Sequence, residues 1–313
     1  MPETAVRKWP VDLLHILMLG ALLCVTLFGV GRIPGAIAWV AFDVFGICVV
    51  LGVSRWFRTA APRRAALARL LLGCGIVPVI FTQVGFVLAE FRDVENAGLL
   101  FQLDKSLFWG GNPLEWIERI SSPWLTEVMQ WGYTAYLLLP VATVWVIATG
   151  ASPKEVSRSM WCLLGGIYLS YVGYALVPTS GPNIHSNLGP LAPVSIPVLP
   201  LYQFSDPLPG VWIAQELREW MFHAEPTKRD CFPSGHVAVA FICAVLTTRV
   251  GRQHACWAWP LAVIVTVSTV YLRYHFVVDV VAGIILAYVA TGPFAVFHDR
   301  LVIRANQPSR VRS

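Results

Sequence analysis

Eight long apolar runs restrict the fold of this chain more than any other feature of its sequence. They cover approximately residues 11–30, 35–54, 66–89, 128–149, 160–177, 234–250, 257–273 and 276–297. A helix needs about 20 apolar residues to cross the hydrocarbon layer of a bilayer. Within that layer each backbone polar group must find a partner in the protein, and a helix provides one within its own segment. The sequence therefore predicts an all-α fold, a polytopic transmembrane helix bundle with about eight spans.

Composition and charge support a membrane protein and argue against a nucleic-acid partner. Charged residues make up 13% of the chain, about half the share that is usual in soluble domains. The lysines and arginines form short clusters beside the apolar runs rather than a basic arm. If the N-terminus is cytoplasmic, 15 of these 23 residues fall on the cytoplasmic side and 8 on the other. The positive-inside rule then predicts that both termini face the cytoplasm of a cell membrane.

Two long loops remain outside the predicted spans, both on the extracytoplasmic side. The first, 90–127, is rich in tryptophan and includes a short segment, 113–120, with the pattern of an interfacial helix. Tryptophan at this density is typical of the headgroup zone. The second, 178–233, has ten prolines and cannot form one regular element. Within it, 211–223 predicts an amphipathic helix that lies on the membrane surface or covers the bundle.

The polar segment before the sixth apolar run has the composition of an anion site. From Lys228 to His236 it reads Lys-Arg-Asp-Cys-Phe-Pro-Ser-Gly-His. Pro and Ser suit the start of a helix, and the amides at a helix start bind anions. We expect Ser234 to bind phosphate through its hydroxyl group and Gly235 to allow close approach. Lys228 and Arg229 would add positive charge.

A second polar segment stands at the start of the last apolar run. His275 and Asp279 are four residues apart, so on a helix they share one face. A carboxylate there holds the imidazole in one tautomer and raises its nucleophilicity. Arg273 lies two residues before the histidine. In the eight-span topology His236 and His275 fall at the same end of their spans and can converge.

Two histidines, a carboxylate, several cations and a helix N-terminus together describe a phosphoryl-transfer site. One histidine attacks phosphorus and the other protonates the leaving oxygen. Cations and amides stabilise the equatorial oxygens. This covalent route needs no metal and no cofactor, and the sequence has no evident carboxylate cluster for Mg²⁺. A zinc site formed by His236, His275 and Asp279 is an alternative, which the neighbouring cations oppose.

The sequence resembles the phosphatidic acid phosphatase type 2 superfamily over roughly residues 66–297. The motifs that carry the resemblance are Pro-Ser-Gly-His, which ends at His236, and a later His-x-x-x-Asp from His275 to Asp279. The resemblance implies that His275 is the phosphohistidine nucleophile and Asp279 its orienting partner. It implies that His236 is the acid that protonates the leaving group.

The same resemblance implies a domain organisation. A catalytic core of six helices would occupy residues 66–297 and include both long loops. Residues 1–65 would form an extension of two transmembrane helices. The last residues, 298–313, would form a cytoplasmic basic tail.

Two departures from the phosphatase branch make the chain similar to another branch of the superfamily. The arginine expected six residues before the nucleophile is absent at Ser268-Thr269 and stands instead at Arg273. The superfamily's first motif is also absent, and its place holds Pro178-Thr179-Ser180-Gly181-Pro182-Asn183. This pattern resembles inositol phosphorylceramide synthase-like proteins and their bacterial relatives. The expected substrate-binding residues are then Ser234, Gly235, Lys228, Arg229, Arg273 and Asn183.

We therefore expect a membrane phosphatase that hydrolyses a lipid phosphate or diphosphate at the extracytoplasmic face, with membrane lipids around it. The alternative is a lipid phosphotransferase that passes the phospho-headgroup to an alcohol. A transporter without chemistry is a further class, but Asp43 is nearly alone as an intramembrane charge. For Asp43 we expect a packing or interfacial role, and for Asp104 and Lys105 a solvated loop pair.

Overall fold

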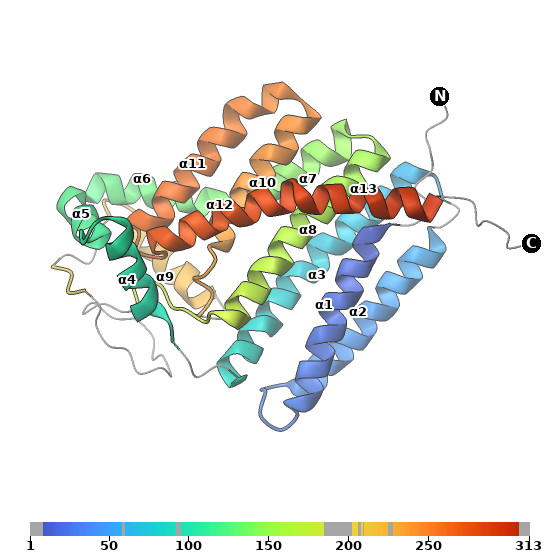
Figure 1. The fold of residues 1–313 in the computed structure, drawn as a ribbon, viewed down its shortest axis with the longest axis horizontal. Helices are drawn as coiled ribbons and strands as arrows, with labels where there is room; N and C mark the ends of the chain where they lie inside the picture. The colour runs from blue at the N-terminus through green and yellow to red at the C-terminus, as the bar shows by residue number, and fades with distance from the viewer. Residues whose placement is uncertain are drawn as a thin grey trace, which may run out of the picture.

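The computed structural model describes residues 9–57, 60–91, 95–184, 202–205, 208, 210–224 and 228–306. Its helices are α1 (Pro10–Phe28), α2 (Ala36–Trp56), α3 (Pro62–Phe91), α4 (Ala97–Leu107), α5 (Pro113–Ile120), α6 (Pro123–Thr134), α7 (Leu138–Gly150), α8 (Pro153–Leu176), α9 (Ala214–Ala224), α10 (Gly235–Val250), α11 (Ala255–Tyr271), α12 (Val277–Thr291) and α13 (Pro293–Asn306). Short 3₁₀ turns, Ala135–Leu137 and Arg252–His254, lie between α6 and α7 and before α11. The described part of the chain has no β-strand, which confirms the predicted all-α bundle (Figure 1).

Seven helical segments are long and apolar enough to cross a membrane, counted over the described residues. They correspond to seven of the eight predicted runs, with α6–α7 and α12–α13 each forming one segment. The eighth run is α10, whose 16 residues fall short of the roughly 20 that a full crossing needs. Helices α7, α8, α11 and α12 enclose α10, and most of its side chains are buried. Protein rather than lipid surrounds this helix, so its length is less constrained.

Helix ends differ from the apolar runs because polar residues continue some helices. Helix α8 begins at Pro153, seven residues before the predicted run, and Ser152 closes a capping box at its start. After a break at Gly292, α13 continues to Asn306. The segment predicted as a tail therefore begins within a helix, and residues 307–313 lie outside the described residues.

The two short helices predicted in the loops are present. Helix α5 has the bounds expected for the interfacial segment. Helix α9 begins three residues later than the predicted amphipathic segment and ends one residue beyond it. Much of the proline-rich loop around α9 lies outside the described residues.

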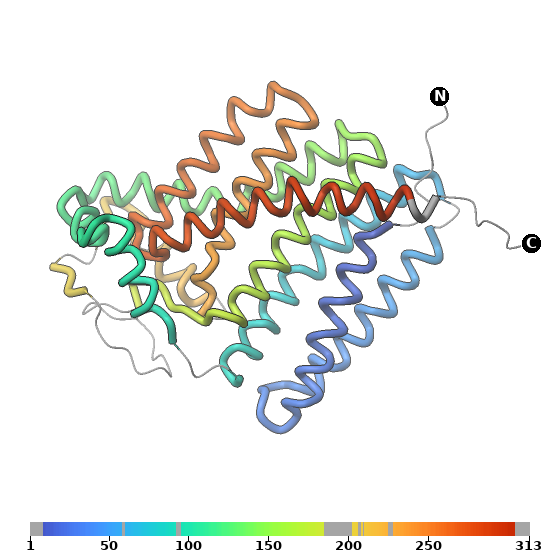
Figure 2. Tube along the Cα trace, viewed as in Figure 1, coloured from blue at the N-terminus to red at the C-terminus, as the bar shows by residue number. Residues whose placement is uncertain are grey.

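Helices α1 and α2 pack beside α3 (Figure 2). Buried polar contacts join both helices to α3. Arg69 of α3 forms two hydrogen bonds of 2.8 Å with the carboxylate of Asp12 in α1, and both side chains are buried. Gln83 of α3 donates a hydrogen bond of 2.8 Å to Asp43 of α2. Asp43 therefore contributes to packing between two helices. Polar contacts of this kind hold helices together where lipid removes the hydrophobic driving force.

Buried carboxylates hold the loop segments against helix starts. Asp104 of α4 accepts hydrogen bonds from the backbone N–H groups of Val277 and Val278, at 2.9 and 2.7 Å. Glu127 of α6 accepts bonds of 3.0–3.3 Å from four consecutive backbone amides, 211–214, at the start of α9. Helix starts leave N–H groups without intrahelical partners and attract negative charge. The carboxylates therefore fix where α9 and α12 begin.

The expectation of a solvated pair at Asp104 and Lys105 was wrong for the aspartate. Asp104 is 1% exposed, because α4 packs against α12. Lys105 is half-buried, with its ammonium 5.6 Å from the centre of the Phe101 ring. The sequence does not show which helix start a loop carboxylate will meet.

Replacing Arg69 with Met should strongly destabilise the docking of α1. The variant leaves the Asp12 carboxylate buried without its partner, and removal of one member of a buried ion pair costs about 3–5 kcal/mol. Thermal unfolding of the purified protein in detergent measures the change. Arg64→Met, at an exposed position of the same helix, should unfold near the wild-type temperature. Equal unfolding temperatures for the two variants would contradict this role of the ion pair.

Replacing Asp104 with Ala should loosen the first turn of α12. Two backbone N–H groups lose their acceptor, and each buried group left unsatisfied costs about 1–3 kcal/mol. Hydrogen exchange followed by mass spectrometry should show faster exchange in a peptide that covers 273–280. Gln102→Ala, at an exposed position of α4, is the matched control and should exchange like the wild type. Unchanged exchange in Asp104→Ala would show that the cap does not hold this turn.

Candidate functional site

The segments that carry the predicted motifs meet at one end of the bundle. The segment after α8 runs beside the segment before α10, and the backbone N–H of Cys231 donates to the carbonyl oxygen of Thr179 at 3.0 Å. The connection between α11 and α12 joins them, because the N–H of Asn183 donates to the carbonyl oxygen of Arg273 at 2.8 Å. Close backbone approach explains the glycine at Gly181, where a Cβ would lie 2.2 Å from a carbonyl oxygen of that connection.

The two motif histidines face each other at this meeting point. Nε2 of His275 lies 3.4 Å from Nδ1 of His236, with the rings edge to face. Their positions are 39 residues apart in the chain. The predicted convergence of the two histidines is therefore a feature of the structure.

Asp279 and His275 are close together, but they do not lie on one face of a helix as expected. Helix α12 begins at Val277 with Phe276 as its N-cap, so His275 precedes the helix. Oδ2 of Asp279 accepts the backbone N–H of Phe276 at 2.8 Å and lies 3.6 Å from Nδ1 of His275. That second separation is longer than a hydrogen bond. The two residues are neighbours, but the expected shared helix face was wrong because the helix begins at Val277 and His275 lies before it.

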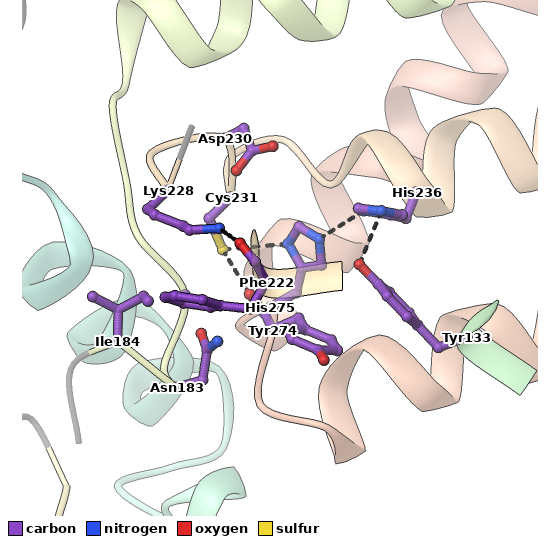
Figure 3. Close-up of a pocket in the computed structure, with 11 residues that line it drawn as sticks. Tyr133, Asn183, Ile184, Phe222, Lys228, Asp230, Cys231, His236, Tyr274 and His275 are labelled. Carbon is purple, nitrogen blue, oxygen red and sulfur yellow. Dashed lines mark hydrogen bonds between the residues drawn. The ribbon is translucent and has the colours of Figure 1, made fainter. Parts of the chain in front are cut away.

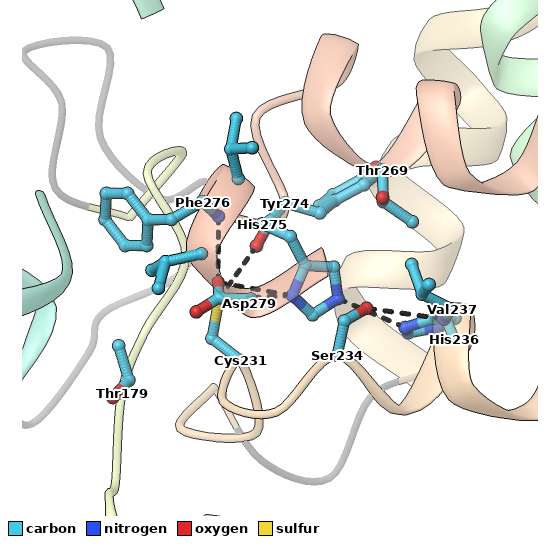
Figure 4. A network of polar contacts seen from close by, with 12 residues as sticks. Thr179, Cys231, Ser234, His236, Val237, Thr269, Tyr274, His275, Phe276 and Asp279 are labelled. Carbon is cyan, nitrogen blue, oxygen red and sulfur yellow. Dashed lines mark hydrogen bonds and ion pairs between the residues drawn. The ribbon is translucent and has the colours of Figure 1, made fainter. Parts of the chain in front are cut away.

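Cys231 contacts both the histidine and the carboxylate (Figure 4). Its Sγ lies 2.7 Å from Oδ2 of Asp279 and 3.3 Å from Nδ1 of His275. A thiol has one hydrogen, and the carboxylate is the stronger acceptor. The sulfur then accepts the Nδ1–H of His275. This arrangement keeps the proton on Nδ1 and leaves the lone pair on Nε2, the atom that faces His236.

Aromatic side chains fix the second histidine. The hydroxyl group of Tyr133 lies 2.9 Å from Nε2 of His236. The ring of Tyr136 packs on the same imidazole with ring centroids 4.7 Å apart. Tyr133 in turn stacks on Tyr274, with centroids 4.6 Å apart. The imidazole of His236 therefore has one nitrogen held by a hydroxyl group and the other directed at His275.

These groups open onto a pocket (Figure 3). Of the residues predicted from the sequence, four line it: His236, His275, Lys228 and Asn183. Helix α9 contributes Phe222 to the wall. The pocket thus combines two imidazoles, an ammonium group and an amide, a set of groups that suits a phosphate.

Lys228, Arg273 and Arg229, the three predicted phosphate-binding cations, differ in whether they line the pocket. The ammonium group of Lys228 lies 3.9 Å from the centre of the Phe222 ring and donates to the carbonyl oxygen of that residue. Arg273 is buried, has a φ of +66° and stacks its guanidinium group on Phe204, 3.6 Å from the ring centre. Arg229 is buried as well. The two arginines are not among the residues that line the pocket, so the structure brings only Lys228 to its wall.

Ser234 and Gly235 hold the start of α10. Ser234 is the N-cap, and its hydroxyl oxygen accepts the N–H of Val237 at 3.4 Å. A Cβ at Gly235 would lie 2.1 Å from the hydroxyl oxygen of Tyr174, so this position needs glycine for packing. Both residues lie outside the pocket wall. Their predicted contact with phosphate stays a prediction.

Burial changes the acidity of two groups in the segment before α10. Burial raises the pKa of Asp230 to about 6, against the opposing effect of His275. Burial, followed by the nearby Asp279, raises the pKa of the Cys231 thiol well above its usual range. The thiol therefore keeps its hydrogen at neutral pH, as the bridge between His275 and Asp279 requires. Asp230 titrates close to neutral pH in the pocket wall.

Sequence reasoning missed three residues of this arrangement. Cys231 and Asp230 stand inside the polar segment that ends at His236, and their place among motif residues was a usable signal. Tyr133 lies inside an apolar run, where nothing in the spacing separates it from a packing residue. Among the described residues, one group of histidine, cysteine and acidic side chains is close enough to hold a metal ion, and it includes Cys231.

Comparison with known proteins agrees with the motifs at this site. A PA-phosphatase related-family protein of Dictyostelium discoideum is 27% identical over 81 residues, which are 26% of this chain and 15% of that protein. The match thus spans a small part of the relative's length. No solved structure matches the chain. A family model described as PAP2 superfamily matches residues 100–292, more than half of the sequence, and the chain therefore belongs to the PAP2 superfamily.

Proposed function

We propose that the protein is a membrane-embedded phosphatase that hydrolyses a lipid phosphate or diphosphate through a phosphohistidine intermediate. Membership of the superfamily indicates a membrane enzyme of the phosphatase type. The observation that carries the proposal is the 3.4 Å separation between Nε2 of His275 and Nδ1 of His236 at the wall of one pocket. The reaction needs a nucleophile for phosphorus and a proton donor for the leaving oxygen within reach of the same bound phosphate, and the two imidazoles meet that need at one pocket.

In the first step Nε2 of His275 attacks phosphorus, and the bond from phosphorus to the lipid oxygen breaks. A bound phosphate favours the imidazolium form of His236, which gives its Nδ1 proton to that oxygen. The proton on Nδ1 of His275 remains directed at the sulfur of Cys231, 3.3 Å away. The carboxylate of Asp279 beyond it supports the positive charge that develops on the phosphorylated ring. The lipid leaves as an alcohol, or as a monophosphate if the substrate was a diphosphate.

In the second step water attacks the phosphohistidine from the pocket. His236 takes the proton of that water, the P–N bond breaks, and inorganic phosphate leaves. Lys228 lines the pocket and supplies positive charge to the phosphoryl oxygens. The buried arginines at Arg229 and Arg273 remain proposed contributors to the field of the site. Ser234, Gly235 and Asn183 remain proposed phosphate contacts.

The surroundings of the pocket support a lipid substrate. Exposed tryptophans stand on the loops and helices at this end, with Trp109 95%, Trp124 71% and Trp212 74% exposed. Tryptophan favours the depth of lipid headgroups. The excess of lysine and arginine on the other side supports a position of this end outside the cytoplasm. We therefore assign the reaction to the extracytoplasmic face, with a catalytic core in 66–297 and a two-helix extension before it.

A lipid phosphotransferase is the second candidate. The segment that replaces the superfamily's first motif contributes Gly181 and Asn183 to the pocket wall, and its pattern resembles the inositol phosphorylceramide synthase-like branch. An alcohol in the place of water would then receive the phospho-headgroup. The two reactions share the first covalent step and differ only in the acceptor.

A panel of lipid phosphates and diphosphates, with and without inositol or other alcohols, separates the two candidates. We expect release of inorganic phosphate by the purified protein, while formation of a new phosphate ester of the added alcohol would favour the transferase. His275→Ala should lower turnover by at least about 10³-fold because it removes the nucleophile. A radiolabelled substrate should leave an acid-labile, base-stable label on the wild type that this variant lacks.

His254→Ala is the matched control for the panel. This histidine lies in the turn between α10 and α11, at the other end of α10 from His236, and its replacement should leave turnover unchanged. Full turnover by His275→Ala would overturn the proposed mechanism. Turnover without a trapped label would point to direct attack by water.

Replacing Tyr133 with Phe should slow the reaction and shift its pH dependence. The hydroxyl group accepts a hydrogen bond from Nε2–H of charged His236, and a bond to a charged group is worth about 1.5–3 kcal/mol. We expect turnover to fall roughly 10- to 100-fold, and the limb of the pH–rate profile assigned to His236 to move to lower pH. Tyr136→Phe keeps the ring contact and should behave like the wild type. Identical pH profiles in both variants would contradict the role of Tyr133.

A further inference from the structure

Three different metal-binding atoms surround one point beside the pocket. Sγ of Cys231, Nδ1 of His275 and a carboxylate oxygen of Asp279 lie within 4.8 Å of one another. Their separations are 2.7 Å for sulfur to oxygen, 3.3 Å for sulfur to nitrogen and 3.6 Å for nitrogen to oxygen. In a tetrahedral site with zinc bonds of about 2.0–2.3 Å, ligand atoms lie roughly 3.3–3.6 Å apart. The two longer separations already match this range. The sulfur–oxygen separation can lengthen into it once the thiol has lost its hydrogen.

A second observation points to a ligand at the same place. Oδ1 of Asp279 is buried and has no hydrogen-bond partner among the described residues. The whole side chain is 0% exposed. A buried carboxylate oxygen without a partner is costly, and an atom that only accepts is satisfied by a donor or a cation. The separations given above belong to Oδ2, so Asp279 can bind a cation through Oδ2 and can add Oδ1 as a second ligand to the same cation.

We propose that Cys231, His275 and Asp279 form an inhibitory site for a divalent cation of the zinc class. Sulfur, imidazole nitrogen and carboxylate together favour Zn²⁺ or Cd²⁺ over Mg²⁺, which prefers oxygen ligands. Cys231 and His275 line the pocket, so the cation has a path to the site. The fourth ligand of the cation would come from the pocket. The thiol proton leaves to solvent as the metal–sulfur bond forms.

Inhibition follows from the tautomer of His275 and depends on the proposed function. Without metal, Nδ1 carries the proton and Nε2 has the lone pair that attacks phosphorus. A metal bound to Nδ1 uses the lone pair there, so the imidazole proton must reside on Nε2. His275 then has no lone pair facing the pocket. Metal binding and phosphorylation of His275 therefore exclude each other.

The charge of this set differs from that of a zinc site built on His236. Thiolate and carboxylate together bring two negative charges, whereas two histidines and Asp279 bring one. Asp230 adds a further carboxylate in the pocket wall. The ammonium group of Lys228 is held against Phe222. The neighbouring cations therefore oppose a metal at Cys231 less than they oppose one at His236.

The test uses the full-length protein in which the four exposed cysteines, Cys24, Cys48, Cys74 and Cys256, are replaced by Ser. Cd²⁺ alone is titrated without substrate, and the ultraviolet charge-transfer band of a cadmium–thiolate bond reports binding. We expect one Cd²⁺ per chain, displaced by Zn²⁺ but not by Mg²⁺. Cys231→Ser should abolish the band, and Asp279→Asn should weaken affinity by about 10- to 100-fold. Cys162→Ser, at another buried cysteine, should retain the band.

The outcomes separate the metal site from the proposed reaction. Absence of any cadmium–thiolate band in the parent protein overturns the site, whether or not the variants fold. A band that persists in Cys231→Ser also overturns it. If Cd²⁺ binds but Zn²⁺ leaves trapping of the phosphohistidine label intact, the inhibitory role fails. Binding without turnover of any lipid phosphate would instead overturn the proposed function and leave the metal site standing.

Discussion

Hydrogen bonds to buried carboxylates fix the first turn of α12, and the arrangement around the pocket depends on them. Asp104 holds the N–H groups of Val277 and Val278 from outside the helix. Asp279 holds the N–H of Phe276 from within it, and its carbonyl oxygen accepts the N–H of Ser234 at 3.1 Å. These bonds tie the starts of α10 and α12 together. His236 and His275 lie at the starts of α10 and α12, so these hydrogen bonds set the distance between the two imidazoles.

Carboxylates also hold irregular segments at other places in the described part of the chain. Glu127 binds four amides at the start of α9. Glu95 accepts the backbone N–H and the hydroxyl group of Ser180, in the segment that lies along the pocket. Each contact joins residues more than 80 positions apart in the chain. An acceptor-only group in a buried place organises several donors at once, which suits irregular segments with many free N–H groups.

The fold and the centre of the site followed from the sequence to different extents. Apolar runs predict membrane spans because the backbone must be helical within lipid. Among the described residues, seven of the eight predicted runs are helical segments long and apolar enough to cross a membrane. Spacing brought His236 and His275 to one end, but it did not reveal that His275 precedes its helix. The thiol of Cys231 between His275 and Asp279 depends on tertiary placement of three segments. Local pattern carries no information on such contacts.

The buried pairing of α1 and α2 with α3 has a consequence for how the chain enters a membrane. Synthesis delivers Asp12 and Asp43 to the bilayer before Arg69 and Gln83, their partners in the finished bundle. Asp12 lies in the first turn of α1, but Asp43 lies well inside α2, and an aspartate near the centre of an inserting helix costs about 2.5–3.5 kcal/mol. Until α3 follows, the first hairpin carries that cost alone, and its leucine-, valine- and phenylalanine-rich faces must outweigh it. Insertion of the first two helices is then completed only when the third arrives.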